Sequence, residues 1–181
     1  MATFDPSRGW LAPPGIPERE LVRRGAGGWQ PKTEVIGPGY RSAYGLVMMI
    51  LHQPLGGAEG APLYADTTLR VHGSANYTSV VEGVSHGCHR LYNQLALRLA
   101  GFLLRHRAHT RQGDLQTSYQ RRLYWRDRTL SLGATSRGHR YELTPPVPVE
   151  VLPGRVRGAV RAPLTRPFPV PRGLISQYRR W

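Results

Sequence analysis

Proline divides this chain into parts that can and cannot hold long hydrogen-bonded elements. Eight of its 16 prolines lie at or before Pro62, eight lie at or after Pro145, and none lies between Leu63 and Thr144. Proline lacks a backbone donor and fixes φ, so regular structure can run unbroken only where proline is absent. The interval from Leu63 to Thr144 is therefore expected to form the centre of the fold.

The composition outside this interval predicts three segments. Residues 1–39 are expected to be an irregular lead-in rich in proline and glycine, residues 40–152 a single domain, and residues 153–181 a tail rich in proline and arginine. The N-terminus lacks the basic start and apolar run of a secretory signal, and the longest apolar run, residues 46–51, is too short to cross a bilayer. We therefore expect neither a signal peptide nor a membrane span.

Hydrophobic periodicity within the domain predicts a mainly β fold with one substantial helix. An apolar run at 45–51 favours a buried strand, and residues 69–71 favour a second strand that ends in His72. Alternating side chains further along the chain predict antiparallel strands. These are expected at 115–125, 130–132 and 141–143, with turns at 127–128 and 136–138 and an extension through 147–151. Apolar residues at spacings of three and four predict an amphipathic helix over 91–106.

Charge and cysteine content bound the partners and the redox chemistry. The 25 Lys and Arg residues against 11 Asp and Glu give a formal charge of +14 and a pI near 11.1. Such a charge favours anionic partners: nucleic acid, acidic lipid or a polymer that carries carboxylates. Because Cys88 is the one cysteine, the chain cannot form an intrachain disulfide, and this residue is free, modified or a ligand.

The cysteine lies in the run Ser85-His86-Gly87-Cys88-His89-Arg90, shortly after His72-Gly73-Ser74. At the expected helix start, unpaired backbone N–H groups and the adjacent His and Arg would favour the thiolate, which is the nucleophilic form. Gly87 permits a backbone conformation in which successive amides point at one spot and hold an oxyanion. His72, at the end of its strand, is the candidate base. Together these residues predict an acyl-transfer site.

Two other interpretations of the cysteine stay open at this level. Inert packing is the common role of a lone cysteine, although polar and basic neighbours disfavour it here. A zinc site built from His86, Cys88 and His89, completed by His72 or His52, is the second alternative. The sequence shows no second pair of ligands at the usual spacing, which disfavours zinc. We expect no metal and no cofactor.

The motif resembles the catalytic domain of the L,D-transpeptidases, the YkuD-type domain of bacterial cell-wall enzymes. That family carries a histidine-glycine pair, then Ser/Thr-His-Gly-Cys, one variable residue, and Arg or Asn. The matching residues here are His72-Gly73, Ser85-His86-Gly87-Cys88 and Arg90, with His89 at the variable position. The match is best over residues 40–104. It implies a YkuD-like β-sandwich in which one substantial helix follows the catalytic cysteine.

The resemblance also implies a role for each matching residue. Cys88 would attack a peptidoglycan stem peptide, His72 would be the general base, and the amides of Gly87 and Cys88 would form the oxyanion hole. Site support or substrate binding would fall on five further residues: Ser85, His86, Arg90, Gly73 and Ser74. A terminal D-alanine would leave, and the acyl group would pass to an amine or to water. These are the outcomes of an L,D-transpeptidase and an L,D-carboxypeptidase.

The same resemblance implies a setting for the protein. It implies the cell envelope or periplasm as the location, peptidoglycan stem peptides as partners, no nucleic acid, and a monomer. The family's domain normally begins with more β structure than residues 1–45 indicate, which predicts truncation at the N-terminus. Two alternatives from other classes remain: a basic module that binds nucleic acid or wall polymer, and a catalytically inactive relative that serves as a wall-binding scaffold. The charge and two aromatic-interleaved basic runs, at 119–126 and 178–181, favour the basic module.

Overall fold

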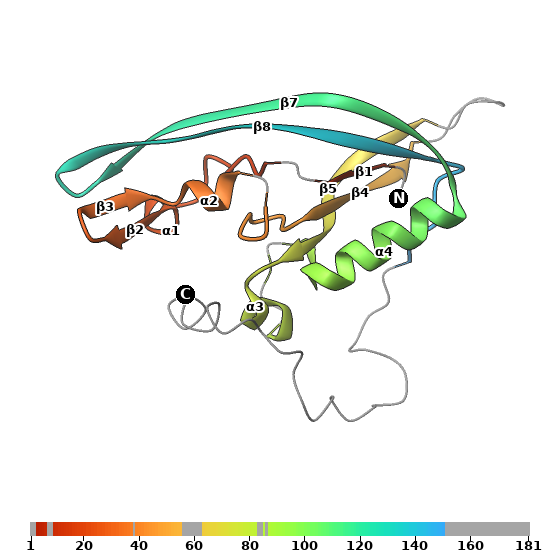
Figure 1. Ribbon diagram of the computed structural model, residues 1–181, viewed down its shortest axis with the longest axis horizontal. Helices are drawn as coiled ribbons and strands as arrows, with labels where there is room; N and C mark the ends of the chain where they lie inside the picture. Colours follow the sequence, from red (N-terminus) through yellow and green to blue (C-terminus); the bar gives the residue numbers. More distant parts are fainter. Residues whose placement is uncertain are drawn as a thin grey trace. The chain divides into compact units, whose positions relative to one another are not determined.

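The protein is mainly β, and its largest element is a six-stranded sheet with strand order β6-β5-β4-β1-β8-β7 (Figure 1). The computed structural model describes residues 3–6, 9–37, 39–55, 63–82, 85 and 87–150. The compact unit Met1–Pro148 contains every element named below. The strands of the large sheet are β1 (Thr3–Pro6), β4 (Val47–Pro54), β5 (Tyr64–Ser74), β6 (His89–Tyr92), β7 (Ala108–Trp125) and β8 (Arg128–Thr144). Neighbouring strands run antiparallel, except that β5 and β6 are parallel.

Four helices and a two-stranded sheet complete the described elements. They are α1 (Glu18–Leu21), the β2 (Val22–Gly25) and β3 (Gly28–Pro31) hairpin, α2 (Thr33–Ile36), α3 (Tyr77–Val81) and α4 (Asn93–His106). The helices α1 and α2, the β2–β3 hairpin and strand β1 all lie within the segment that was expected to be irregular. The prediction of an irregular lead-in over 1–39 is therefore wrong for residues 3–6 and 18–36.

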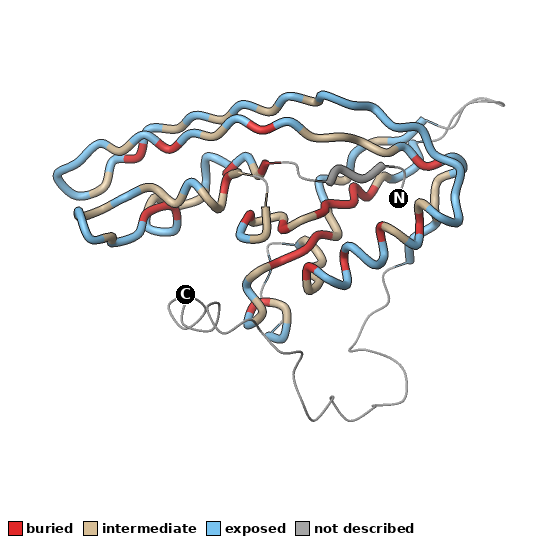
Figure 2. Tube along the Cα trace, in the orientation of Figure 1, coloured by how far each residue is buried: buried red, intermediate tan, exposed pale blue. Residues whose placement is uncertain are grey.

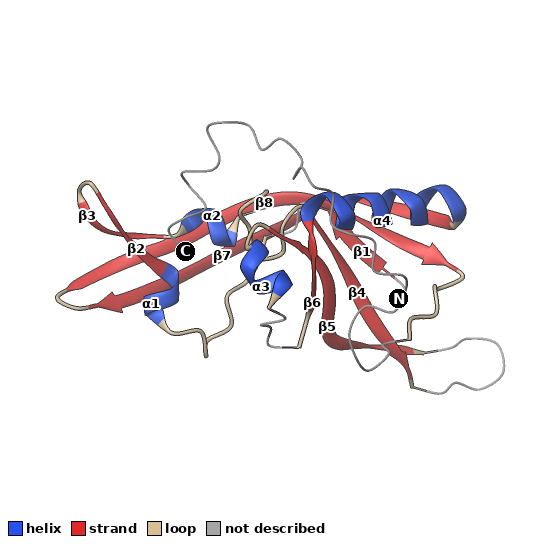
Figure 3. Cartoon of the chain, turned by 90° about the horizontal axis from the view of Figure 1, so that it is seen from below, coloured by secondary structure: helices blue, strands red, loops and turns tan. Residues whose placement is uncertain are grey.

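One hydrophobic core lies between α4 and the large sheet. Buried side chains of β4, α4 and β8 form it: Val47, Met49, Ala96, Ala100, Leu103 and Leu143. Figure 3 shows α4 lying along one face of this sheet. Alanines on the inner side of α4 let the helix backbone approach the strands closely, and burial of each larger side chain stabilises the fold by roughly 1.5–3 kcal/mol.

A second core lies under the far half of the β7–β8 hairpin. Its buried residues come from the N-terminal segment and from the hairpin: Ala12, Leu21, Val22, Ile36, Leu123 and Leu132. The rings of Trp29 and Trp125 meet edge to face with centroids 5.3 Å apart. Figure 1 shows β2, β3, α1 and α2 side by side with this half of the hairpin. The short N-terminal elements are thus held by packing against the hairpin rather than by their own length.

The predicted strands and helix are largely confirmed, with three corrections. The strand expected at 45–51 is β4, and residues 69–71 lie within β5, which continues through His72 to Ser74. The helix begins at Asn93 rather than at residue 91, because residues 89–92 form β6. The turn expected at 136–138 is wrong, since β8 passes through it unbroken. The extension expected at 147–151 is also wrong for Val147 and Val149, because β8 ends at Thr144 and the chain to residue 150 is irregular; residue 151 lies outside the described residues. The other turn, at Arg126-Asp127, is confirmed within one residue.

Candidate functional site

Strand alternation gives the β4–β5–β6 part of the sheet two unlike faces. Met48 pairs with His72, and His72 pairs in turn with Arg90. Paired residues on neighbouring strands point to the same side, so these three side chains share one face. Val71 pairs with His89, and both belong to the opposite face, where α4 packs. The histidine of the motif and the arginine after the cysteine are therefore brought together on the face away from α4.

His72 is held as a neutral base with a defined tautomer. Its side chain is buried, and Nδ1 lies 2.7 Å from the carbonyl oxygen of Gly73, so Nδ1–H donates and Nε2 carries the lone pair. The ring of Tyr44 meets the imidazole edge to face with centroids 5.2 Å apart. Burial, together with the positive charge of Arg90, lowers the pKa of His72 below its ordinary value, although the hydrogen bond to Gly73 acts in the opposite direction. A histidine with this environment stays unprotonated at neutral pH.

Asn93 is a buried residue that positions this site and that the motif did not indicate. Its Oδ1 accepts a hydrogen bond from the Leu46 amide at 2.9 Å, and its Nδ2 donates to the Tyr40 carbonyl at 3.2 Å. A β-carbon on Gly73 or on Gly45 would overlap Asn93 Oδ1. The first residue of α4 is thus locked against the backbone next to His72. The sequence signal for this contact was the pair of glycines, Gly45 and Gly73, because a glycine leaves room for another group to approach the backbone where a β-carbon would collide with it.

The cysteine loop has the expected glycine conformation but a different neighbour. Gly87 adopts a φ of +111°, in the region that favours glycine, and Ser85 Oγ donates to the Cys88 carbonyl at 2.5 Å. Cys88 is half-buried and directly precedes β6. The prediction that it lies at a helix start is wrong, because α4 begins five residues later, so the helix terminus does not supply the activation expected from it. Among the described residues no hydrogen bond joins Cys88 Sγ to His72.

The remaining residues of the motif separate into three groups. Arg90 lies on the His72 face, whereas His89, at the variable position of the motif, lies on the α4 face. Ser74 is buried, and its Oγ accepts from the Asn76 amide at 3.1 Å, so in this structure it stabilises the turn before α3. His86 lies outside the described residues. No group of three ligands that could hold a metal ion occurs within the described part of the chain.

A groove of about 520 Å³ extends from the base along the same face of the sheet. At one end it is lined by Tyr44, whose ring contacts His72, and by Met48, which pairs with His72. Further along, its lining comes from side chains of β4, β5 and β8: Ile50, His52, Asp66, Arg70 and Arg140. Arg70 donates to both carboxylate oxygens of Asp66, at 2.6 and 2.7 Å, and this hydrogen bonding is the main cause that lowers the pKa of Asp66. The groove therefore offers oriented cationic and polar groups beside the candidate base.

His52 lies in this groove, on strand β4, as the cross-strand neighbour of Asp66. Its Nδ1 is buried without a hydrogen-bond partner among the described residues. Burial is the largest cause that lowers the pKa of His52, with Asp66 acting in the opposite direction. The imidazole of His52 therefore contributes to the lining of the groove, while its Nδ1 lies out of reach of solvent.

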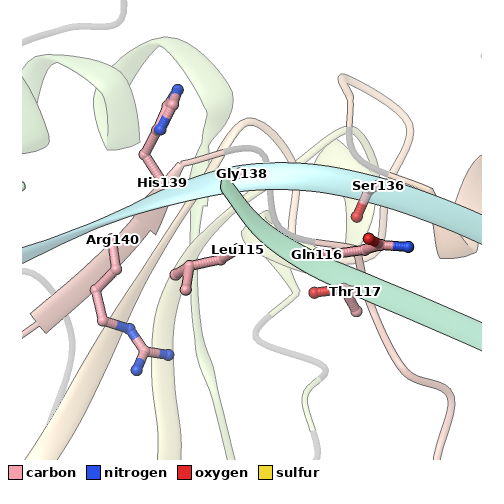
Figure 4. Close-up of a pocket in the computed structure, with 7 residues that line it drawn as sticks. All are labelled: Leu115, Gln116, Thr117, Ser136, Gly138, His139 and Arg140. Atoms are coloured by element: carbon pink, nitrogen blue, oxygen red, sulfur yellow. The ribbon is translucent and has the colours of Figure 1, made fainter. Parts of the chain in front are cut away.

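A smaller cavity of about 140 Å³ lies apart from the motif, on the β7–β8 hairpin. It adjoins the register shift between Gln112 and Leu115. Figure 4 shows Arg140 and His139 pointing to opposite sides of β8, so Arg140 takes part in lining both this cavity and the groove. None of the motif residues lines it, and it adds nothing to the chemistry of Cys88.

Comparison with known proteins does not add to this geometry. In the described part of the chain, no helix is both long and apolar enough to cross a membrane. No family model, no curated protein and no solved structure matches this chain.

Proposed function

We propose that this protein is a cysteine acyl-transfer enzyme that acts on peptidoglycan stem peptides, with Cys88 as nucleophile and His72 as general base. The observation that carries the proposal is the state of His72. Its Nδ1 donates to the Gly73 carbonyl, which leaves Nε2 as a proton acceptor. It stands on a strand that pairs in parallel with β6, the strand that begins directly after Cys88. A thiol directly before β6 and a fixed neutral imidazole on β5, the strand that pairs with β6, supply the two groups that nucleophilic acyl transfer needs.

The proposed reaction follows from these parts. His72 Nε2 takes the proton of the Cys88 thiol as Sγ attacks the carbonyl carbon of a peptide bond. The carbonyl oxygen becomes an oxyanion and is held by amides at Gly87 and Cys88, whose loop is shaped by the positive φ of Gly87. His72 then gives its proton to the leaving amine, which departs with the broken C–N bond. An amine or a water molecule attacks the acyl-thioester in a second step and releases Cys88.

The substrate class and the finer fold belong to the same proposal. Support for an L,D-transpeptidase relationship comes from the motif and from the order of elements around it: strand with His72, loop with Cys88, short strand, then α4. The finer fold that we propose is a YkuD-like sandwich, and its support is the presence of two sheets, one with six strands and one with two. In this proposal the peptide binds in the groove beside His72, with the Arg70–Asp66 ion pair among the polar groups that line it. A cell-envelope location and a monomeric protein follow as parts of this proposal.

The test is covalent labelling followed by product analysis. A carbapenem incubated with the full chain is expected to add its mass to the protein, and Cys88→Ala is expected to abolish the addition while the circular dichroism spectrum stays unchanged. Purified tetrapeptide muropeptides then distinguish transfer to an amine from transfer to water by the mass of the products. A folded protein whose Cys88 takes up no carbapenem would contradict the proposal.

The two alternative functions make different predictions in the same experiments. A basic module that binds nucleic acid or wall polymer would bind with steep salt dependence, and its binding would survive Cys88→Ala. An inactive wall-binding relative would bind muropeptides without forming an acyl-enzyme. No feature of the site favours either alternative over acyl transfer.

A further inference from the structure

The outer side of α4 carries an apolar stripe that the fold leaves in solvent. The inner side of the helix buries Ala96, Ala100 and Leu103. Leu95, Leu99 and Phe102 recur at spacings of four and three on one flank of the helix, roughly 115° around from the buried side, with exposed fractions of 44%, 37% and 57%. Figure 2 shows the resulting alternation of buried and exposed turns along α4. Spacing in the sequence does not separate the exposed residues Leu95, Leu99 and Phe102 from the buried Leu103, because all four fit a helical period.

Positive charge borders this stripe without any negative charge nearby in sequence. Arg98 and Arg105 are seven residues apart, so they share one side of the helix, next to Leu95 and Phe102. The helix ends in Arg105 and His106, and the His106 ring packs on Phe102 with centroids 4.4 Å apart. Between Glu82 and Asp114 the sequence contains no acidic residue. The outer surface of α4 is therefore apolar and cationic at the same time.

This combination selects one kind of partner. Nucleic acid would pair with the arginines but would leave three large apolar side chains in water, since its recognition relies on phosphate contacts. A bilayer with anionic headgroups satisfies both: the apolar side chains enter the headgroup and acyl boundary, and the arginines meet the phosphates. We propose that α4 lies in the interface plane of an anionic phospholipid bilayer, with Leu95, Leu99 and Phe102 inserted and with Arg98 and Arg105 at headgroup level.

Docking through α4 is compatible with an open catalytic face. The helix covers the Val71 face of the sheet, whereas His72 and the groove lie on the other face. A protein held to a membrane by α4 would thus keep its groove turned away from the lipid. The proposal does not depend on the chemistry of Cys88, and Cys88→Ala is expected to bind vesicles as the wild type does.

Flotation of the full chain with lipid vesicles tests the proposal. Vesicles of phosphatidylcholine mixed with phosphatidylglycerol are expected to carry the protein upward in a density gradient, and vesicles of phosphatidylcholine alone are expected to leave it behind. The double variant Arg98→Gln, Arg105→Gln should bind about thirtyfold more weakly, because each arginine near an anionic surface contributes about 1 kcal/mol. The triple variant Leu95→Gln, Leu99→Gln, Phe102→Gln should weaken binding by at least about tenfold.

Tyr124→Gln is the matched control for loss of an exposed apolar side chain. Tyr124 is 65% exposed on β7, far from α4 in sequence, and its removal should leave flotation unchanged. Thermal melting of each variant checks that the fold is intact. Failure of the wild type to float with anionic vesicles would overturn the proposal, and so would equal binding by the triple variant and the control. Light scattering that shows a dimer lost in the triple variant would assign the stripe to a second copy of the chain instead.

Discussion

The two faces of the β4–β5–β6 sheet are built from the same strands and have opposite properties. On one face Val47, Met49 and Leu91 meet α4 in a hydrophobic core. On the other, His72 lies beside a groove that Arg70 and Met48 help to line. The difference shows how a β protein separates stability from chemistry: neighbouring residues of one strand serve different ends, because successive side chains point to opposite sides. Substitutions at adjacent positions can therefore test one property at a time.

The largest effect is expected from His72→Ala on the groove face. Loss of the general base should slow acylation of Cys88 by a carbapenem by about 100-fold or more, measured by intact-protein mass over time. Its neighbour Val71 points to the α4 face and provides the matched control. Val71→Ala should lower the free energy of unfolding by about 1 kcal/mol and leave the acylation rate of the folded protein unchanged. Acylation of His72→Ala at the wild-type rate would contradict the assignment of His72 as general base.

The second effect is expected from Met49→Ala in the core under α4. Met49 is fully buried, and truncation leaves a cavity between β4 and the helix. The free energy of unfolding, measured by urea denaturation, should fall by about 2–5 kcal/mol. The fraction that remains folded should acylate at the wild-type rate. A slower rate in protein of unchanged stability would show that the two faces are coupled.

A pair of glycines tests the junction where the two faces meet. Gly73→Ala places a β-carbon on Asn93 Oδ1 and displaces the carbonyl that orients His72, so it should lower stability by about 1–3 kcal/mol and slow acylation as well. Gly101 lies in α4, and a β-carbon added to it would meet no other atom within 4 Å. Gly101→Ala should raise stability by about 1 kcal/mol through higher helix propensity. An unchanged or higher melting temperature of Gly73→Ala would argue against the Asn93 contact.

The smallest effect concerns pH and again belongs to the groove face. The pKa of His72 is lowered in the folded state, first by burial, so the unfolded chain binds a proton at a pH where the folded chain does not. The stability contributed by the neutral imidazole should be fully present above about pH 6.5 and should be lost as pH falls through the lower folded pKa. Urea denaturation of the wild type should therefore show a steeper loss of stability on acidification than His72→Gln. His52→Gln corrects for the other histidine on this face, whose pKa is lowered in the same direction.

The sequence predicted those elements whose hydrophobic or turn pattern lies within a few consecutive residues. The apolar run that forms β4, the helix that ends at His106 and the turn after Trp125 all carry their signal within a few residues. The sequence pattern also predicted a strand that runs into His72, which is β5, whereas it put Cys88 at a helix start and the structure has it in the loop directly before β6.

Elements that depend on distant partners were not predictable in this way. The strand Thr3–Pro6 is too short to show a period, and it exists because β4 and β8 pair with its two sides. The inner side of α4 uses alanines, so spacing alone could not show which of two apolar sides meets the sheet. Asn93 gave no motif signal, because its role depends on Gly45 and Gly73, which lie far away in sequence.

The position of β1 has a consequence for how the chain is made. Among the strands that the structure describes it leaves the ribosome first, and in the finished sheet it lies between β4 and β8. Its pairing with β4 can form early, but its other side must wait for residues 141–142 to be synthesised. Throughout that interval the half-built sheet carries an unpaired edge, which is where strands from other molecules attach. Co-translational chaperone capture is therefore expected to concentrate on nascent chains that have not yet reached β8.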